Sequence, residues 1–231
     1  MKRLVFCKCI ALALSALLIL LTGCQRTKPQ TTDTVLVIQP KASSRGVRNF
    51  KKQMGDAFPT YHGLSATDKD CCNIVPREIS EHYGFDIFTL PYDVISYLQY
   101  EDKIYSIGEW GGLVISFAVT DMNADGQWEL FFTCVWGSGR STFRVGYFDS
   151  ATKELTIFED FQVIACEKTP YVVLNAGTDG ALCVCCAEAS DEKQSVLDFN
   201  FRIGEKIASV TYDGAAIALL QENNAILNTN L

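Results

Sequence analysis

One short acidic segment has residue types and spacing that suit metal binding. It reads Asp121-Met-Asn-Ala-Asp-Gly-Gln-Trp-Glu129 and lies between two apolar runs. Oxygen-bearing side chains stand at its first, third, fifth and ninth positions, and the glycine allows a sharp turn that presents the next carbonyl group. Calcium takes about six to eight such oxygen ligands. We therefore predict a calcium site with the ligands Asp121, Asn123, Asp125, Gln127 and Glu129.

The segments on either side of this loop predict strands. Leu113 to Val119 and Leu130 to Trp136 are rich in β-branched and aromatic residues. An EF-hand would instead need a bidentate Glu at position twelve, where Phe132 stands. The strand, acidic loop and strand together resemble the calcium loops of integrin-type propeller repeats and of related bacterial surface-protein repeats. The resemblance ends at Gly146-Tyr-Phe-Asp149 and implies a structural calcium ion.

The same loop also has an interpretation without metal. Ala124-Asp125-Gly126 contains Asp-Gly, a favoured hairpin turn. A plain hairpin has no need for Asp121, Asn123 and Glu129, and acids crowded into one turn repel each other without a cation. We therefore favour calcium, in a role that fixes the loop rather than one in catalysis.

The first residues predict export and lipid attachment. Met1-Lys-Arg3 is basic, and Leu4 to Leu21 is a largely apolar run. Leu21-Thr-Gly-Cys24 resembles the lipobox of bacterial lipoproteins, which implies that the Cys24 thiol is lipidated and that Cys24 becomes the first mature residue. Residues 1–23 are then a signal peptide and residues 24–34 a polar tether. We expect a lipid-anchored membrane protein that faces the extracytoplasmic side.

Charge argues against a nucleic-acid partner. The chain has 20 Lys and Arg residues and 27 Asp and Glu residues, and removal of Lys2, Arg3 and Lys8 with the signal leaves 17 basic residues and a net charge of −10. Nucleic acid would be repelled by such a protein. The stretch Lys41 to Lys52 holds five basic residues and no acid, and it either contacts anionic lipid or wall polymer or is simply solvated. Cell-wall polymer or a surface protein is the expected type of partner.

The rest of the pattern predicts a mainly β (α+β) fold. Residues 35–106 are expected to be irregular or helical, with a possible edge strand at Thr34 to Ile38 and short helices over Val75 to Tyr83 and Pro91 to Leu98. Residues 107–231 are expected to form a β-rich domain, an antiparallel meander or sandwich-like sheet with tight turns. The predicted strands cover residues 113–120, 130–136, 143–147, 155–164, 171–174, 182–186, 197–202, 207–212 and 215–220. On the first strand Leu113, Ile115, Phe117 and Val119 are expected to share a face, and on the second Leu130, Phe132, Cys134 and Trp136.

A second candidate site follows the second predicted strand. It is a loop of Trp136, Gly137, Ser138, Gly139 and Arg140, in which the glycines would let a ligand approach and the arginine would bind an anion. A glycine-rich hairpin loop is the alternative. The seven cysteines that remain after the signal and Cys24 are odd in number, and we expect them to be small packing groups.

Enzymatic motifs are sparse. The two histidines, His62 and His82, do not form His-Glu-x-x-His, and Gly-x-Ser-x-Gly is absent. We predict a binding or structural module of unknown ligand. The alternative is a cell-envelope hydrolase for polysaccharide or peptide, with Trp110 and Trp136 in a cleft and a carboxylate pair that sequence spacing does not reveal. A solute-binding lipoprotein is disfavoured because two lobes of alternating strands and helices are not indicated.

Overall fold

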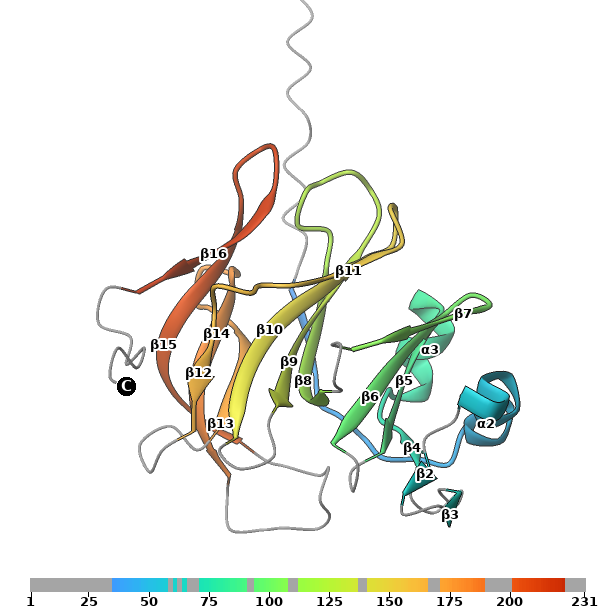
Figure 1. The fold of residues 1–231 in the computed structure, drawn as a ribbon. Helices are drawn as coiled ribbons and strands as arrows, with labels where there is room; N and C mark the ends of the chain where they lie inside the picture. Colours follow the sequence, from blue (N-terminus) through green and yellow to red (C-terminus); the bar gives the residue numbers. More distant parts are fainter. Residues whose placement is uncertain are drawn as a thin grey trace, which may run out of the picture. The chain divides into compact units, whose positions relative to one another are not determined.

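The computed structural model describes residues 35–57, 60–61, 64–65, 71–90, 94–107, 112–136, 141–165, 171–189 and 201–222. The signal peptide, Cys24, the tether and residues 137–140 of the second candidate site lie outside these residues. The described chain is mainly β, as predicted, with three antiparallel sheets and two short α-helices (Figure 1). A separate two-stranded pair joins β2 (Thr60–Tyr61) to β3 (Leu64–Ser65).

The central sheet carries the acidic loop. Its strands lie in the order β1 (Leu36–Ile38), β8 (Leu113–Thr120), β9 (Glu129–Trp136), β10 (Thr142–Asp149) and β11 (Glu154–Ile157), and β12 (Val163–Ile164) also pairs with β10. β1 is at the edge, as predicted. The single strand expected over 155–164 is wrong, because the exposed residues Glu159 and Asp160 form a turn between β11 and β12. β8 and β9 match the strands predicted beside the loop.

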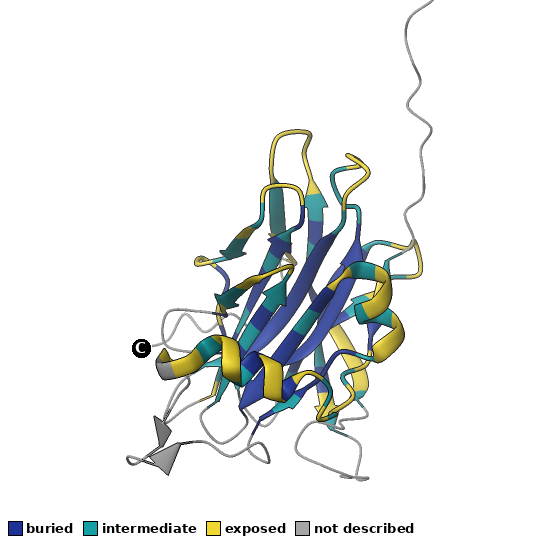
Figure 2. Ribbon diagram, turned by 90° about the vertical axis from the view of Figure 1, so that its right-hand side faces the viewer, coloured by how far each residue is buried: buried dark blue, intermediate teal, exposed yellow. Residues whose placement is uncertain are grey.

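β8 and β9 are apolar at successive positions because both faces of the central sheet are buried (Figure 2). One core lies between this sheet and the N-terminal sheet, and it includes Phe85, Ile87 and Leu98 from the latter. The other core lies toward the C-terminal sheet, with Val172, Leu174 and Val184. The central and C-terminal sheets therefore pack in the sandwich-like manner predicted for residues 107–231, and the N-terminal sheet adds a core that was not predicted.

A β-bulge in β8 corrects the predicted facing of its side chains. The pairing with β9 shifts register between Val114 and Ser116, and the extra residue reverses the alternation. Ile115 therefore lies in the C-terminal core, while Phe117 and Val119 lie in the other core. On β9 the predicted set holds for Leu130, Phe132 and Cys134, which all lie in the core shared with the N-terminal sheet.

The N-terminal sheet replaces the irregular region expected over 35–106. Its order is β4 (Cys72–Asn73), β5 (Phe85–Leu90), β6 (Ile95–Tyr100) and β7 (Lys103–Ser106). The helix predicted over Pro91 to Leu98 is wrong, although residues 91–93 lie outside the description. Ser96 and Leu98 alternate inward, and β6 pairs with both β5 and β7, so that cross-strand pairing outweighs the helical spacing.

Two short helices accompany this sheet. α3 (Arg77–Tyr83) confirms the helix predicted after Pro76, and Gly84 ends it at φ 76° with its N–H bonded to the Ser80 carbonyl. α2 (Val47–Met54), followed by the 3₁₀ turn η1 (Gly55–Ala57), was not expected in the basic stretch. It buries Val47 and Phe50, and the Phe50 ring stacks on Phe88 with ring centroids 4.2 Å apart. Among the described residues, no helix has the length and apolar character that a membrane span requires.

The C-terminal sheet is a meander of β13 (Tyr171–Ala176), β14 (Leu182–Ala189), β15 (Phe201–Tyr212) and β16 (Ile217–Gln221). One long strand, β15, stands where two strands were predicted, and residues 197–200 lie outside the description. Cys183 and Cys185 are buried in β14, and Cys134 in β9, as small packing groups. Burial raises the pKa of Cys134 to about 12 and that of Cys185 to about 11, which keeps both thiols protonated and unreactive.

Candidate metal centre

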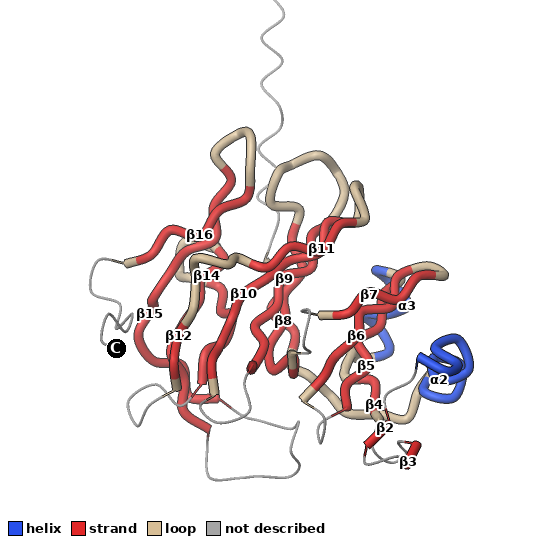
Figure 3. Tube along the Cα trace, viewed as in Figure 1, coloured by secondary structure: helices blue, strands red, loops and turns tan. Residues whose placement is uncertain are grey.

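The acidic loop joins β8 to β9 (Figure 3). The pairing of these two strands ends at Thr120 of β8 and Glu129 of β9. Two residues of the loop take left-handed backbone angles, Ala124 at φ 56° and Gly126 at φ 85°. These angles curl the chain so that the loop folds back over its own start. The result is wider than a two-residue hairpin turn.

Aspartate and asparagine side chains fix the curl through backbone hydrogen bonds. The Asp125 N–H donates to Asp121 Oδ1 at 3.0 Å and to Asn123 Oδ1 at 2.9 Å. The Gly126 N–H donates to Asp121 Oδ2 at 2.8 Å, and the Gln127 N–H donates to Asp125 Oδ1 at 2.7 Å. Oxygen atoms from the first, third and fifth positions of the loop are thereby turned toward its inside.

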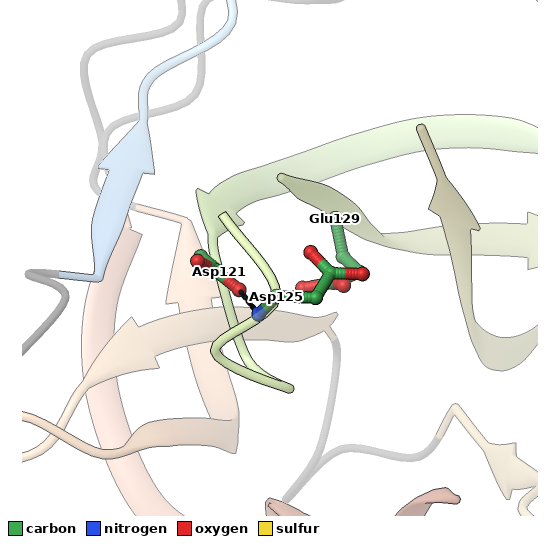
Figure 4. Close-up of side chains that lie close together, drawn as sticks. All are labelled: Asp121, Asp125 and Glu129. Atoms are coloured by element: carbon green, nitrogen blue, oxygen red, sulfur yellow. Dashed lines mark hydrogen bonds between the residues drawn. The ribbon is translucent and has the colours of Figure 1, made fainter. Parts of the chain in front are cut away.

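Three carboxylates meet in this loop (Figure 4). Asp121, Asp125 and Glu129 each offer one oxygen atom, and these atoms all lie within 4.8 Å of one another. Asp125 is exposed, Asp121 is half-buried and Glu129 is fully buried. Such a cluster could hold a metal ion, because a cation would neutralise the repulsion between the carboxylates.

Glu129 is the least solvated of the three acids. Its Oε2 accepts the Met122 N–H at 2.6 Å, while its buried Oε1 has no hydrogen-bond partner within the described chain. Burial raises the pKa of Glu129 to about 7; the Met122 N–H opposes the rise, and the nearby acids Asp121, Asp149 and Asp125 add to it. An ionised carboxylate with an orphaned buried oxygen is costly, and a bound cation would supply the missing partner. The residues present thus fit a cation.

The structure brings together three of the five predicted ligands. Asn123 also turns its side-chain oxygen inward, to the Asp125 N–H. Gln127 is exposed, and the role of its carbonyl as a ligand stays a prediction.

Two further residues at this site were missed by the sequence reasoning. Asp149 stands directly opposite Glu129 in the pairing of β10 with β9, and its Oδ1 accepts the N–H groups of Ala151 and Thr152. Trp128, at the end of the loop, packs its ring against the aromatic rings of Phe85 and Tyr100. The strand register would have revealed Asp149, since a meander places the end of β10 beside the start of β9.

The predicted ligand loop is described only at Trp136. The Arg144 guanidinium lies over the Trp136 ring, 4.8 Å from its centroid, and its Nη1 pairs with Glu159 Oε2 at 2.6 Å. The ring is thus already in a cation–π contact with the protein. Gly137, Ser138, Gly139 and Arg140 lie outside the described residues.

Comparison of this chain with protein families, with curated proteins and with solved structures finds no match. The resemblance of the loop to calcium-binding repeats therefore stays a prediction from its own residues.

Proposed function

We propose that this protein is a lipid-anchored extracytoplasmic protein whose β-rich domain holds one structural calcium ion and serves as a binding or structural module of the cell envelope. Buried Glu129 carries the calcium part of the proposal, because its carboxyl group lies with those of Asp121 and Asp125 and its Oε1 has no hydrogen-bond partner within the described chain. The sequence Leu21-Thr-Gly-Cys24 carries the anchoring part.

The donor set favours calcium over other common metals. The offered atoms are carboxylate and amide oxygens, which suit hard cations, whereas zinc sites use mostly nitrogen and sulfur. The curled loop can supply oxygens from alternate residues, as calcium loops do. Calcium also tolerates irregular geometry, whereas magnesium demands a near-ideal octahedron.

The position of Glu129 supports a metal ligand rather than a general acid. A hydrolase would need its proton-donating carboxyl within reach of the bond that is cleaved. Glu129 is fully buried at the start of β9, between β8 and β10, where a polymeric substrate has no access. The raised pKa of this carboxyl therefore does not favour the hydrolase alternative.

Calorimetric titration of the full-length protein, purified in detergent, tests the calcium part. We expect one site with a dissociation constant of about 10⁻⁴ to 10⁻³ M, as in extracellular modules. At a few millimolar calcium such a site adds about 1 to 2 kcal/mol of stability and raises the unfolding midpoint by roughly 2 to 8 °C. Asp125→Ala should abolish both effects, while Asp160→Ala, which changes an exposed acid on the turn after β11, should leave both intact. Absence of calcium binding by the parent would refute the proposal.

Metabolic labelling with a radioactive fatty acid in a bacterial host tests the anchor. We expect label on the parent and on Cys9→Ser, and none on Cys24→Ser. Label that persists in Cys24→Ser would contradict attachment at that residue.

A further inference from the structure

Trp128 is the residue through which the acidic loop contacts the N-terminal sheet. It directly precedes Glu129, and its half-buried indole packs against the core between the central and N-terminal sheets. Its ring centroid lies 5.3 Å from that of Phe85 on β5, 5.3 Å from that of Tyr100 on β6 and 5.9 Å from that of Tyr83 at the end of α3. One loop residue thus contacts three elements of the N-terminal region.

The backbone of Trp128 is held by the turn that follows β10. Its N–H donates to Ser150 Oγ at 3.1 Å, and its carbonyl accepts the Ser150 N–H at 3.1 Å. Since the next residue is the buried acid of the cluster, a cation on Glu129 would restrain the peptide that positions the Trp128 ring.

The other end of the loop contacts the opposite core. Met122, whose N–H holds Glu129 Oε2, packs against the core toward the C-terminal sheet. A second contact reaches the N-terminal sheet beside Trp128: Lys153 Nζ pairs with Glu101 Oε2 at 2.7 Å, between the β10–β11 and β6–β7 turns. The acidic loop therefore lies where all three sheets meet.

We propose that metal occupancy of the acidic loop governs how firmly the N-terminal sheet docks on the central sheet, with Trp128 as the connecting residue. The inference rests on the proposed calcium site and adds a mechanical role to it. Without the ion, the carboxylates of Asp121, Asp125 and Glu129 repel one another and loosen the loop, and with it the indole between Tyr83 and Tyr100. With the ion bound, the loop and the aromatic contacts form one unit.

Linkage makes the coupling reciprocal. If calcium favours the docked arrangement, then weaker docking must lower the affinity for calcium. Tyr100 allows this test, because it contacts Trp128 but belongs to β6 and contributes no ligand to the cluster. Tyr97 is a matched control on the same strand. It is also half-buried, but it packs toward Phe50 of α2, with ring centroids 5.7 Å apart.

Hydrogen exchange and calorimetric titration of the full-length protein in detergent test the inference. In the parent, calcium at a few millimolar should slow exchange roughly 5- to 30-fold, both in residues 121–129 and in β6 and α3. Tyr100→Leu should lose the effect in β6 and α3 and bind calcium at least about threefold more weakly, whereas Tyr97→Leu should behave as the parent.

Two results would overturn the coupling while leaving the calcium site in place. One is calcium-dependent protection confined to residues 121–129 in the parent. The other is a calcium affinity of Tyr100→Leu equal to that of Tyr97→Leu. If the parent shows no heat of calcium binding, the calcium site and the coupling fail together, which titration of the parent alone reveals.

Discussion

In two hairpins of this protein an aspartate accepts hydrogen bonds from the backbone of its own turn, but the two hairpins differ in whether a buried carboxyl group is left without a partner. In the β15–β16 turn, Asp213 Oδ1 accepts the N–H groups of Ala215 at 2.8 Å and Ala216 at 2.9 Å, and these bonds lower its pKa. In the β8–β9 loop, Asp121 accepts backbone N–H groups similarly, but Glu129 is buried nearby with its pKa raised to about 7. The aspartate of the first turn is satisfied by backbone N–H groups, whereas the second turn also contains a buried Glu129 oxygen that has no partner within the described chain.

The difference comes from the strands that follow the two turns. β16 lies at the edge of the C-terminal sheet and is half exposed, so water solvates its turn. β9 lies between β8 and β10, so its first residue, Glu129, enters a sheet that is buried on both faces. An Asp-Gly pair is common to both turns and thus does not set them apart. The buried acid at the start of β9 does, and it is the feature on which we base the proposed metal site.

The largest expected contrast concerns the aromatic residue beside each turn. Trp128→Ala removes a ring packed on four aromatic neighbours and should cost about 2 to 4 kcal/mol of unfolding free energy. Tyr212→Ala removes an exposed ring and should cost less than about 1 kcal/mol. Urea unfolding in chelator measures both without a contribution from calcium. Equal losses would mean that the acidic loop is no better anchored than the other turn.

The second contrast is in the direction of the change in unfolding free energy, and it concerns Glu129→Gln measured in chelator. The ordinary pKa of 4.5 rises to about 7 in the folded protein, so the native state holds the proton more tightly. The contribution of Glu129 to stability is therefore fully present below about pH 4.5 and is lost as pH rises through about 7. Gln stays neutral, and the variant should be about 1 to 3 kcal/mol more stable than the parent at pH 8.

Asp213→Asn is the control, because its unfolding free energy is expected to change in the opposite direction. Backbone hydrogen bonds lower the pKa of Asp213, so its carboxylate stabilises the fold above its ordinary pKa of 3.8, and that stability is lost at more acid pH. The variant should therefore be less stable than the parent at pH 8. Urea unfolding at pH 5 and pH 8 measures both variants. A Glu129→Gln protein that is no more stable than the parent at pH 8 would show that Glu129 carries no electrostatic cost.

Calcium binding should itself depend on pH. A protonated Glu129 must lose its proton before it can bind the ion, so protons compete with calcium below about pH 7. We expect roughly 10- to 30-fold weaker binding at pH 5.5 than at pH 8. Titration at the two pH values, in buffers of different ionisation heat, also counts the protons released. Equal affinities with no proton release would remove Glu129 from the ligand set.

Local patterns predicted the neighbourhood of the site well. The runs Leu113 to Val119 and Leu130 to Trp136 are apolar at almost every position, which leaves little choice but buried strands, and they became β8 and β9. The helix before Gly84 was also predicted correctly, because a proline and a glycine mark its two ends.

The errors occurred where a distant partner decides the structure. Val94, Ile95 and Leu98 fit a helix, yet β5 and β7 pair with this segment and make it a strand. Because of the bulge at Val114 to Ser116, the side chains of Ile115 and Phe117 lie on opposite faces of the sheet. No residue type in this segment predicts the bulge. For the same reason Asp149 and the contacts of Trp128 escaped notice, since they depend on register and on packing between sheets.

The smallest contrast compares alanine substitutions of one glycine in each turn, Gly126 and Gly214. It tests whether the backbone conformation of the acidic loop affects calcium binding. Gly126 and Gly214 have φ values of +85° and +95°, and an added Cβ would meet nothing within 4 Å at either position. Alanine should therefore cost about 1 kcal/mol at each site in chelator, from backbone strain alone. In calcium, Gly126→Ala should lose a few tenths of a kcal/mol more, because altered backbone angles move the oxygens of Asp125 and Gln127 away from the ion. Gly214→Ala should lose the same amount with calcium as without, and thermal unfolding in both conditions compares the two. If calcium stabilises Gly126→Ala as much as it stabilises Gly214→Ala, the curl of the loop does not set the geometry of the site.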